Sequence, residues 1–303
     1  MLVLEDQNRL QPWVFLNSLI LLCSVIYSDQ KERYAITTIL LILSASYFWG
    51  GLQKANFFFG TEMFPWLAEF TGQQAFLREH PIVGVLVAGI EALAGLGLMF
   101  GFSRKIAAII LLLMHVFILT ALGPFGHNWN HVVWPWNICF ALLLFVLSNK
   151  KDIKLWERTL FRKKYYIFFF VAVAALPSLG VLGKWDHFLS GGYYSAVIPE
   201  AIFYYHEKDR SNLPESSTDF QYFTKGTREE FVLIDQWALN HLGVPSYPEI
   251  RVKKQIGKKL CSCLDYPKKA GLRIHYKYRF TQGRFETLEF PCSSLGFITG
   301  GLE

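Results

Sequence analysis

Two ionisable residues, Glu91 and His115, lie inside long apolar stretches of the sequence. Ionisable groups at membrane depth cost free energy, so they are functional candidates. The two residues lie almost equally far from a turn at Ser103 and Arg104, so an antiparallel helical hairpin brings them to the same depth. A Glu–His pair could relay a proton or hold a polar head group. Alternatively, it is a hydrogen-bonded pair that only fixes helix packing.

A third candidate, Lys54, follows Gly50 and Gly51 near the end of another apolar run. A lysine at a helix end often extends its ammonium group to the membrane interface. The two glycines favour a second interpretation, because they allow another helix or a ligand to approach closely. Lys54, Glu91 and His115 are therefore the candidate catalytic residues.

Weaker candidates lie around the start of the fifth apolar run. His127 and His131 could share a helix face, but no third ligand is suitably spaced, and we expect no metal site. Tryptophans here also suit the aromatic belt of a membrane interface, and an asparagine within a span also suits a bond between helices. The candidate cofactor-binding residues are Gly51, Gln53, Trp134 and Asn137.

The composition explains how such residues come to lie in apolar surroundings. Of the 303 residues, 52% are hydrophobic and 18% are charged, whereas about a quarter of a soluble domain is charged. This balance excludes a disordered chain, a basic nucleic-acid-binding domain and an ordinary cytosolic enzyme. A membrane core about 30 Å thick is spanned by roughly 17–25 apolar residues. Six runs predict spans, at residues 12–27, 34–58, 81–102, 106–122, 131–147 and 165–182.

The positive charges of the loops predict an orientation. One set of loops carries Lys31, Arg33, Arg104, Lys105, Lys150, Lys151, Lys154, Arg158, Arg162, Lys163 and Lys164, and the other set carries few bases. The basic side should be cytoplasmic, which leaves both termini outside. The segment 149–164 is either an interfacial helix on anionic lipid or a solvated loop. A cleaved signal peptide is the alternative for the first run. We expect a multi-pass protein of a bacterial inner (plasma) membrane.

The residues after Gly183 predict a small extracytoplasmic α+β module, so that the domains are 1–183 and 184–303. Residues 202–205 predict a strand, and residues 272–280 and 285–290 a β-hairpin. A helix is expected to begin at Thr227 and to end at Gly243.

A second, basic helix is expected from Pro248, and it is either solvated or placed on anionic head groups. Three cysteines lie in this module, so one disulfide is expected, from Cys292 to either Cys261 or Cys263. A Cys-x-Cys redox centre is the alternative.

Residues 47–147 also resemble the DoxX family of small four-helix membrane proteins. The resemblance is carried by Gly51-Leu52-Gln53-Lys54, by the Ile90–Leu98 segment and by the turn Gly101-Phe102-Ser103-Arg104-Lys105. It implies an all-α membrane fold, here a six-helix bundle with a DoxX-like four-helix core, and a redox-associated protein that handles quinone or electrons. The Gly-Leu-x-Lys segment and His115 are also similar to the membrane domain of vitamin-K-dependent carboxylase-like (HTTM) proteins. That resemblance implies a quinol-driven enzyme with Lys54 or His115 as the base.

Three hypotheses about function follow. The first is a redox- or quinone-associated membrane protein, an oxidoreductase or its accessory subunit, whose polar site opens to the outer side. The second is the carboxylase-like enzyme, and the third is a non-enzymatic scaffold whose outer module binds a partner. Expected partners are membrane lipid, a quinone and an extracytoplasmic redox or partner protein, but no nucleic acid. The resemblance to DoxX proteins makes a quinone the expected cofactor.

Overall fold

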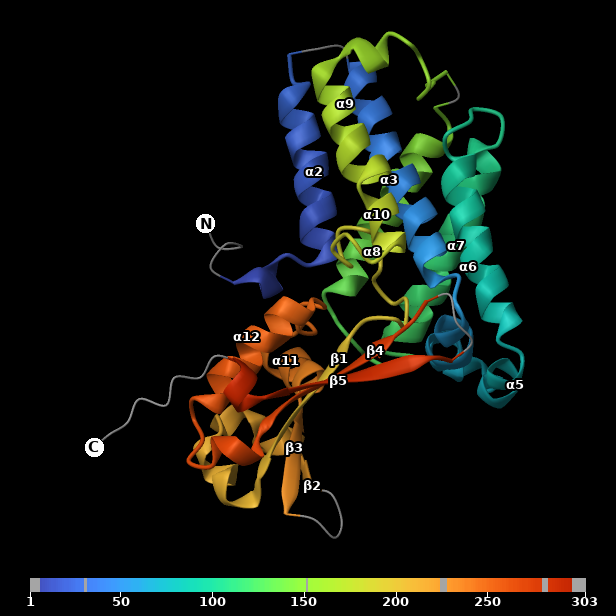
Figure 1. Ribbon diagram of the computed structural model, residues 1–303. Coiled ribbons are helices and arrows are strands. Elements are labelled where there is room, and N and C mark those ends of the chain that lie inside the picture. Colours follow the sequence, from blue (N-terminus) through green and yellow to red (C-terminus); the bar gives the residue numbers. More distant parts are fainter. Residues whose placement is uncertain (1–5, 30–31, 151, 224–227, 280–282, 296–303) are drawn as a thin grey trace. The chain divides into compact units, whose positions relative to one another are not determined.

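The computed structural model describes residues 6–29, 32–150, 152–223, 228–279 and 283–295. The chain divides into two compact units. The helical unit contains residues 10–197 and 279–283, and the sheet unit contains residues 1–9, 198–278 and 284–303. Figure 1 shows the helices of the first unit and the mixed strands and helices of the second.

Within the described residues, three helices of the helical unit are long and apolar enough to cross a membrane. They are α3 (Glu32–Lys54), α7 (Arg104–Leu122) and the helix Lys164–Val181, which consists of α9 (Lys164–Phe170), a π-helical turn (Val171–Ala175) and α10 (Pro177–Val181). The other three predicted spans form shorter apolar helices: α2 (Pro12–Ile26), α6 (Ile82–Gly97) and α8 (Val133–Ser148).

Two helices are shorter than the apolar runs that predicted them. The run expected to continue to Phe102 leaves the helix after Gly97, whose carbonyl oxygen accepts a hydrogen bond from Ser103 Oγ at 2.8 Å. The run expected to end at Phe58 stops at Lys54, and two short helices follow it, α4 (Phe64–Leu67) and α5 (Gln74–Glu79). Beyond these helix ends Leu98, Met99 and Phe58 are buried, whereas Phe100 and Phe102 are exposed.

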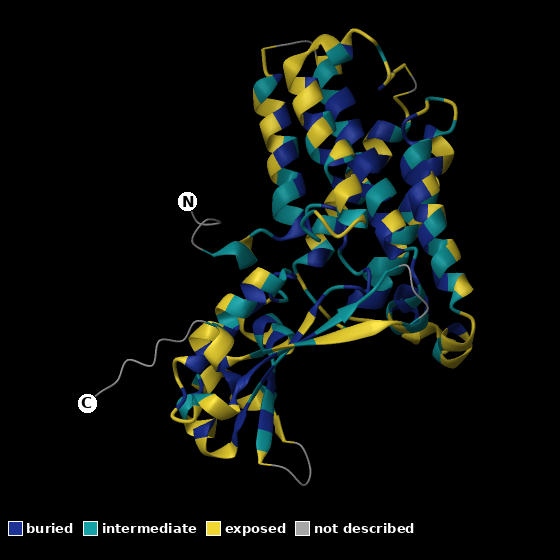
Figure 2. Ribbon diagram, in the orientation of Figure 1, coloured by how far each residue is buried: buried dark blue, intermediate teal, exposed yellow. Residues whose placement is uncertain are grey.

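Large apolar side chains remain on the outside of the helical unit. Exposed and buried residues alternate around the helices in Figure 2. The exposed ones include Leu86, Leu113 and Leu142, each about 60% exposed (59%, 65% and 61%). An apolar exterior of this kind suits a hydrocarbon environment and not water.

The segment between α8 and α9 is not an interfacial helix in its described residues. It forms turns and one short 3₁₀ turn, Leu160–Arg162. It is also not freely solvated, because Ile153 and Leu155 are buried. Arg104 fixes it: this fully buried guanidinium donates to the carbonyl oxygens of Leu98 and Ile153, each at 2.8 Å. Arg104 is therefore a structural residue as well as a loop charge.

The α3 and α6 helices make direct backbone contact. A Cβ atom on Gly51 would lie 2.4 Å from the Ala92 nitrogen, and one on Gly95 would lie 2.4 Å from the Phe48 nitrogen. Only glycine leaves room for such an approach. This contact places the side chains of the α3 and α6 helices within hydrogen-bonding distance of each other.

The sheet unit is built on a five-stranded antiparallel sheet of order β2-β3-β1-β4-β5. The strands are β1 (Glu200–His206), β2 (Gln221–Phe223), β3 (Glu229–Leu233), β4 (Gly271–Lys277) and β5 (Phe285–Pro291). Alternate residues such as Phe203, Val232 and Leu272 form its core. The predicted strand at 202–205 and the predicted hairpin are confirmed, whereas residues 280–282 of the hairpin turn lie outside the described part.

The helix expected from Thr227 to Gly243 is only partly correct. Thr227 lies outside the described residues, and Glu229–Leu233 is strand β3, because Val232 faces the core and pairs with Phe203. The helix is α11 (Ile234–Leu242), and Gly243 ends it in the left-handed conformation with φ of 71°. The basic helix expected after Pro248 is α12 (Ile250–Cys261).

A disulfide joins Cys261, at the end of α12, to Cys292, directly after β5. This is one of the two pairings that the sequence leaves open. Cys263 is exposed and outside this disulfide.

The boundary between the units lies at residues 197 and 198, later than the expected boundary at Gly183. The intervening segment packs on the end of α3, where Gly191 approaches the Gly50 nitrogen and Asn56 Nδ2 donates to the Ser195 carbonyl oxygen at 2.8 Å. These contacts make it part of the helical unit.

Candidate functional site

A cavity of about 390 Å³ lies inside the helical unit. Most of its wall is apolar and comes from α6, α7, α8 and the short α4. Its polar lining consists of the side chains of Tyr47, Lys54, Glu91, His115, Asn137, Tyr193 and Tyr194. A mainly apolar cavity with a few convergent polar groups is the usual form of a small-molecule site.

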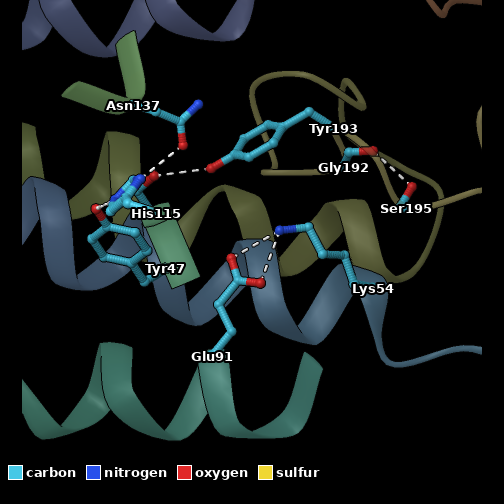
Figure 3. A network of polar contacts seen from close by, with 9 residues as sticks. Tyr47, Lys54, Glu91, His115, Asn137, Gly192, Tyr193 and Ser195 are labelled. Atoms are coloured by element: carbon cyan, nitrogen blue, oxygen red, sulfur yellow. Dashed lines mark hydrogen bonds and ion pairs between the residues drawn. The ribbon is translucent and has the colours of Figure 1, made fainter. Parts of the chain in front are cut away.

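The first polar group of the cavity is an ion pair. Lys54 Nζ lies 2.8 Å from Glu91 Oε1 and 2.9 Å from Oε2 (Figure 3). Both side chains are buried, with residue exposures of 7% and 6%. A buried charge needs a partner of opposite sign, and each of these residues supplies it for the other. Gly50 makes room for the pair, because a Cβ atom there would lie 3.2 Å from Glu91 Oε1.

The second polar group is a hydrogen-bonded chain through His115. Asn137 Nδ2 donates to the Val133 carbonyl oxygen at 2.8 Å, which leaves Asn137 Oδ1 as the acceptor for His115 Nδ1 at 2.7 Å. In the neutral imidazole, Nε2 is then an acceptor, and Tyr47 donates its hydroxyl proton to it at 2.6 Å. The network thus assigns the tautomer and connects a phenol with a base at the cavity wall.

Tyr193 closes the cavity from the segment that follows α10. Its hydroxyl lies 3.1 Å from Ser46 Oγ, and Lys54 Nζ lies 5.5 Å from the centre of its ring. Burial raises the pKa of the Tyr193 phenol, so the hydroxyl stays neutral and able to donate. The segment has a special backbone conformation, since Tyr194 (φ 56°) and Ala196 (φ 61°) are left-handed. Non-glycine residues of this kind cost about 1–3 kcal/mol each and cluster at functional sites.

The helices place these side chains through their regular spacing. Tyr47 and Lys54 lie seven residues apart on α3, which corresponds to about two turns, so they share one face. Lys54 is the last residue of α3, where the helix dipole favours a cation. Glu91 meets it from the middle of α6 because the glycine contacts hold the two helices close together.

The candidate catalytic residues Lys54, Glu91 and His115 all line the cavity, but they are paired differently from the prediction. Glu91 bonds to Lys54, and His115 bonds to Tyr47 and Asn137. The expected Glu–His pair is therefore wrong as a direct contact. Lys54 on α3 binds the Glu91 carboxylate in place of His115, because a charge-assisted bond to an ammonium group is stronger than a hydrogen bond to a neutral imidazole.

The candidate cofactor-binding residues separate into two groups. Asn137 lines the cavity, whereas Gly51 lies against the backbone of α6. Gln53 donates to the Ser190 carbonyl oxygen at 3.2 Å, and Trp134 Nε1 donates to that of Leu122 at 2.9 Å. These three residues hold the walls in place and do not face the cavity.

The two outer histidines have separate roles in packing. His127 Nε2 lies 2.7 Å from the Trp66 carbonyl oxygen, and its ring stacks on the Trp66 indole at 4.1 Å. His131 packs on Trp134, with ring centres 4.7 Å apart. Neither histidine lines the cavity.

Sequence reasoning did not select Tyr47 and Tyr193. The spacing of Tyr47 from Lys54 was a usable signal, since it places both residues on one helix face. No local signal identifies Tyr193, which reaches the cavity only through the tertiary fold.

Comparison of the sequence with protein-family models found no match, and searches of curated proteins and of solved structures also found none.

The arrangement offers a defined chemistry. The amino group of Lys54 and the phenols of Tyr193 and Tyr194 can donate hydrogen bonds to oxygen atoms of a bound molecule, and the apolar wall can hold its hydrocarbon part. Tyr47 and His115 can pass a proton between them. Binding and proton transfer at an oxygen atom are therefore the reactions that this site can support.

Proposed function

We propose that the helical unit is a membrane-embedded binding site for an amphiphile with a small oxygen-bearing head group, and that this amphiphile is a quinone. The supporting observation is that one apolar cavity contains both the Lys54–Glu91 ion pair and the Tyr47–His115 hydrogen bond. An ion pair and a histidine kept away from water carry a desolvation cost that packing alone does not require. A ligand that uses these groups accounts for them.

The protein is then redox- or quinone-associated, in agreement with its likeness to DoxX proteins. In this proposal all six apolar helices cross a bacterial inner membrane, and both termini are extracytoplasmic. The uneven distribution of Lys and Arg supports that orientation.

The residues have separate tasks in this proposal. A quinone, when bound, supplies two-electron redox chemistry. Lys54 and Tyr193 donate hydrogen bonds to its oxygen atoms, and Glu91 balances the ammonium charge. Tyr47 and His115 hold a proton at the cavity wall. An extracytoplasmic partner protein supplies or takes the electrons.

The carboxylase-like alternative requires a free base. Lys54 Nζ contacts both oxygen atoms of the Glu91 carboxylate, so this nitrogen is engaged by a partner and does not lie free in the cavity as a base. His115, neutral in the network above, is the remaining candidate base. The structure therefore favours quinone binding over deprotonation of a substrate by Lys54.

Mass spectrometry of quinones extracted from the detergent-purified full-length protein tests the proposal. Wild type is expected to carry quinone, and Glu91→Gln is expected to lose it, because the ammonium of Lys54 is left without its counter-charge. Glu79→Gln is the matched control, since Glu79 is exposed at the end of α5. The proposal would be refuted if no quinone were found in wild type or in either variant. It would also be refuted if wild type and Glu91→Gln carried equal amounts of quinone.

A further inference from the structure

A second hollow, of about 290 Å³, lies along the seam between α6 and α7. It shares two lining residues, Ile90 and Ile110, with the cavity described above. Its other lining residues are Leu93, Ala94, Gly97, Ser103, Ile106 and Ala107. We call this hollow the seam groove. It adjoins the cavity and leads away from it toward the turn between the two helices.

The seam groove is open to the outside of the helical unit. Leu93 and Ile106, which form its sides, are 68% and 65% exposed. Ala94 and Ala107 are buried and form its floor, where their short side chains leave the space unfilled. Of the described residues that line it, none is charged. Such a surface suits a hydrocarbon chain.

The cavity itself also reaches this surface. Leu113 lines the cavity and is 65% exposed, and Ile90 lines both hollows and is 47% exposed. The polar end of the cavity, in contrast, is buried at Glu91 and His115. Polarity therefore decreases from the ion pair outward along α6 and α7.

We propose that the seam groove binds the hydrocarbon tail of the amphiphile whose head group occupies the cavity, and that the ligand enters sideways from the membrane between α6 and α7. This inference rests on the proposed function, because it assigns a place to the second half of the same ligand. The segment of α7 from Ile106 to His115 is about 14 Å long at the usual helical rise. The ligand class is thus an isoprenoid or similar long-chain quinone, and not a water-soluble one.

Two photoreactive quinones test this inference on the full-length protein in lipid nanodiscs. One carries a diazirine on a tail-free head group, and the other carries it at the end of a tail of two or three isoprene units. Labelled peptides are identified by mass spectrometry. The tail probe is expected to label Leu93–Gly97 and Ser103–Ile106 several-fold more than the exposed apolar face of α8 at Leu142 and Phe145.

Two tryptophan variants on α7 provide the control. Ile106→Trp fills the seam groove and is expected to abolish tail labelling there, whereas Ile109→Trp should leave it unchanged, since Ile109 is exposed but lines neither hollow. Labelling by the head probe should be the same in both variants, which shows that they are folded. Tail labelling that is uniform over the exposed helices, insensitive to Ile106→Trp, or directed to a second copy of the chain would overturn the inference.

The head probe separates this inference from the proposed function. Labelling near His115 that is lost in Glu91→Gln supports the cavity site whatever the tail does. If the head probe does not label the cavity in wild type, the proposed function fails, and the tail assignment fails with it.

Discussion

The Lys54–Glu91 ion pair provides a test that separates folding from ligand recognition. Three variants are required: Lys54→Met, Glu91→Leu and the double variant with both changes. Met and Leu keep most of the apolar volume of the original side chains and remove the charges. Each single variant leaves one buried charge without a partner, and the double variant leaves none.

The expected magnitudes follow from the burial of the pair. Both residues are less than a tenth exposed, at 7% and 6%, and they share two hydrogen bonds of 2.8 and 2.9 Å. Removing one member of a buried ion pair costs about 3–5 kcal/mol, whereas replacing both by apolar groups is often close to neutral. The two single variants should therefore be destabilised by about 3–5 kcal/mol each, and the double variant should recover most of that loss.

The assay is a denaturant titration in detergent micelles, combined with measurement of bound quinone. The double variant should unfold near the wild-type midpoint and carry no quinone. Single variants as stable as wild type would show that the pair is not buried from solvent as described. A double variant that still binds quinone would refute the role of the pair in recognition.

Three further predictions concern packing, the disulfide and pH. Gly95→Ala places a Cβ atom 2.4 Å from the Phe48 nitrogen, and this overpacking should destabilise the protein by about 1–3 kcal/mol and lower its thermal midpoint in micelles. Gly89→Ala, where a Cβ atom would meet nothing within 4 Å, should leave the midpoint unchanged, and equal midpoints for the two variants would contradict the close contact. Cys292→Ser removes the disulfide to Cys261, which links residues 31 positions apart, and should lower the stability of the sheet unit by about 3–4 kcal/mol. The loss should be seen as faster proteolysis after β5, and unchanged proteolysis would contradict a stabilising disulfide. The Arg210 guanidinium donates to the Glu230 carboxylate and lowers the pKa of that carboxyl below its ordinary value of 4.5. The ionised carboxylate therefore stabilises the folded sheet unit above pH 4.5, and this stabilisation is lost as the pH falls through the lowered pKa. Glu230→Gln should flatten the acid side of a profile of hydrogen exchange against pH, and an unaltered profile would contradict this role of Glu230.

The sequence predicts the elements of the helical unit better than their ends. Apolar runs locate the six longer apolar helices but not the short α4 and α5, because hydrophobicity alone identifies a segment that avoids water. The runs overestimate α6, since the turn after Gly97 is as apolar as the helix. In the tail, an apolar and aromatic run predicts β1, and alternation predicts the hairpin. Strand β3 is not predicted, because it passes directly into α11 and the two periodicities overlap.

The candidate site is predicted in its residues and not in its pairing. The cost of charge in an apolar run identifies Glu91 and His115 without knowledge of the fold. The choice of Lys54 as the partner of Glu91 depends on the approach of α3 to α6, which is a property of two glycines on separate helices. The contribution of Tyr193 depends on a segment that returns to the bundle, and no periodicity predicts that return.

The glycine contacts pack α3 against α6 backbone to backbone, whereas a hollow separates α6 from α7. Backbone packed on backbone leaves no side chain that can change rotamer, so these two helices have to shift together. The α7 helix is held to α6 by side chains around a hollow seam, and it carries His115. A molecule that parts this seam would therefore lengthen the Tyr47–His115 hydrogen bond while the Lys54–Glu91 distance stays constant. The length of the Tyr47–His115 hydrogen bond would then report whether the cavity is occupied, because this bond joins the α3 helix to the α7 helix at the site.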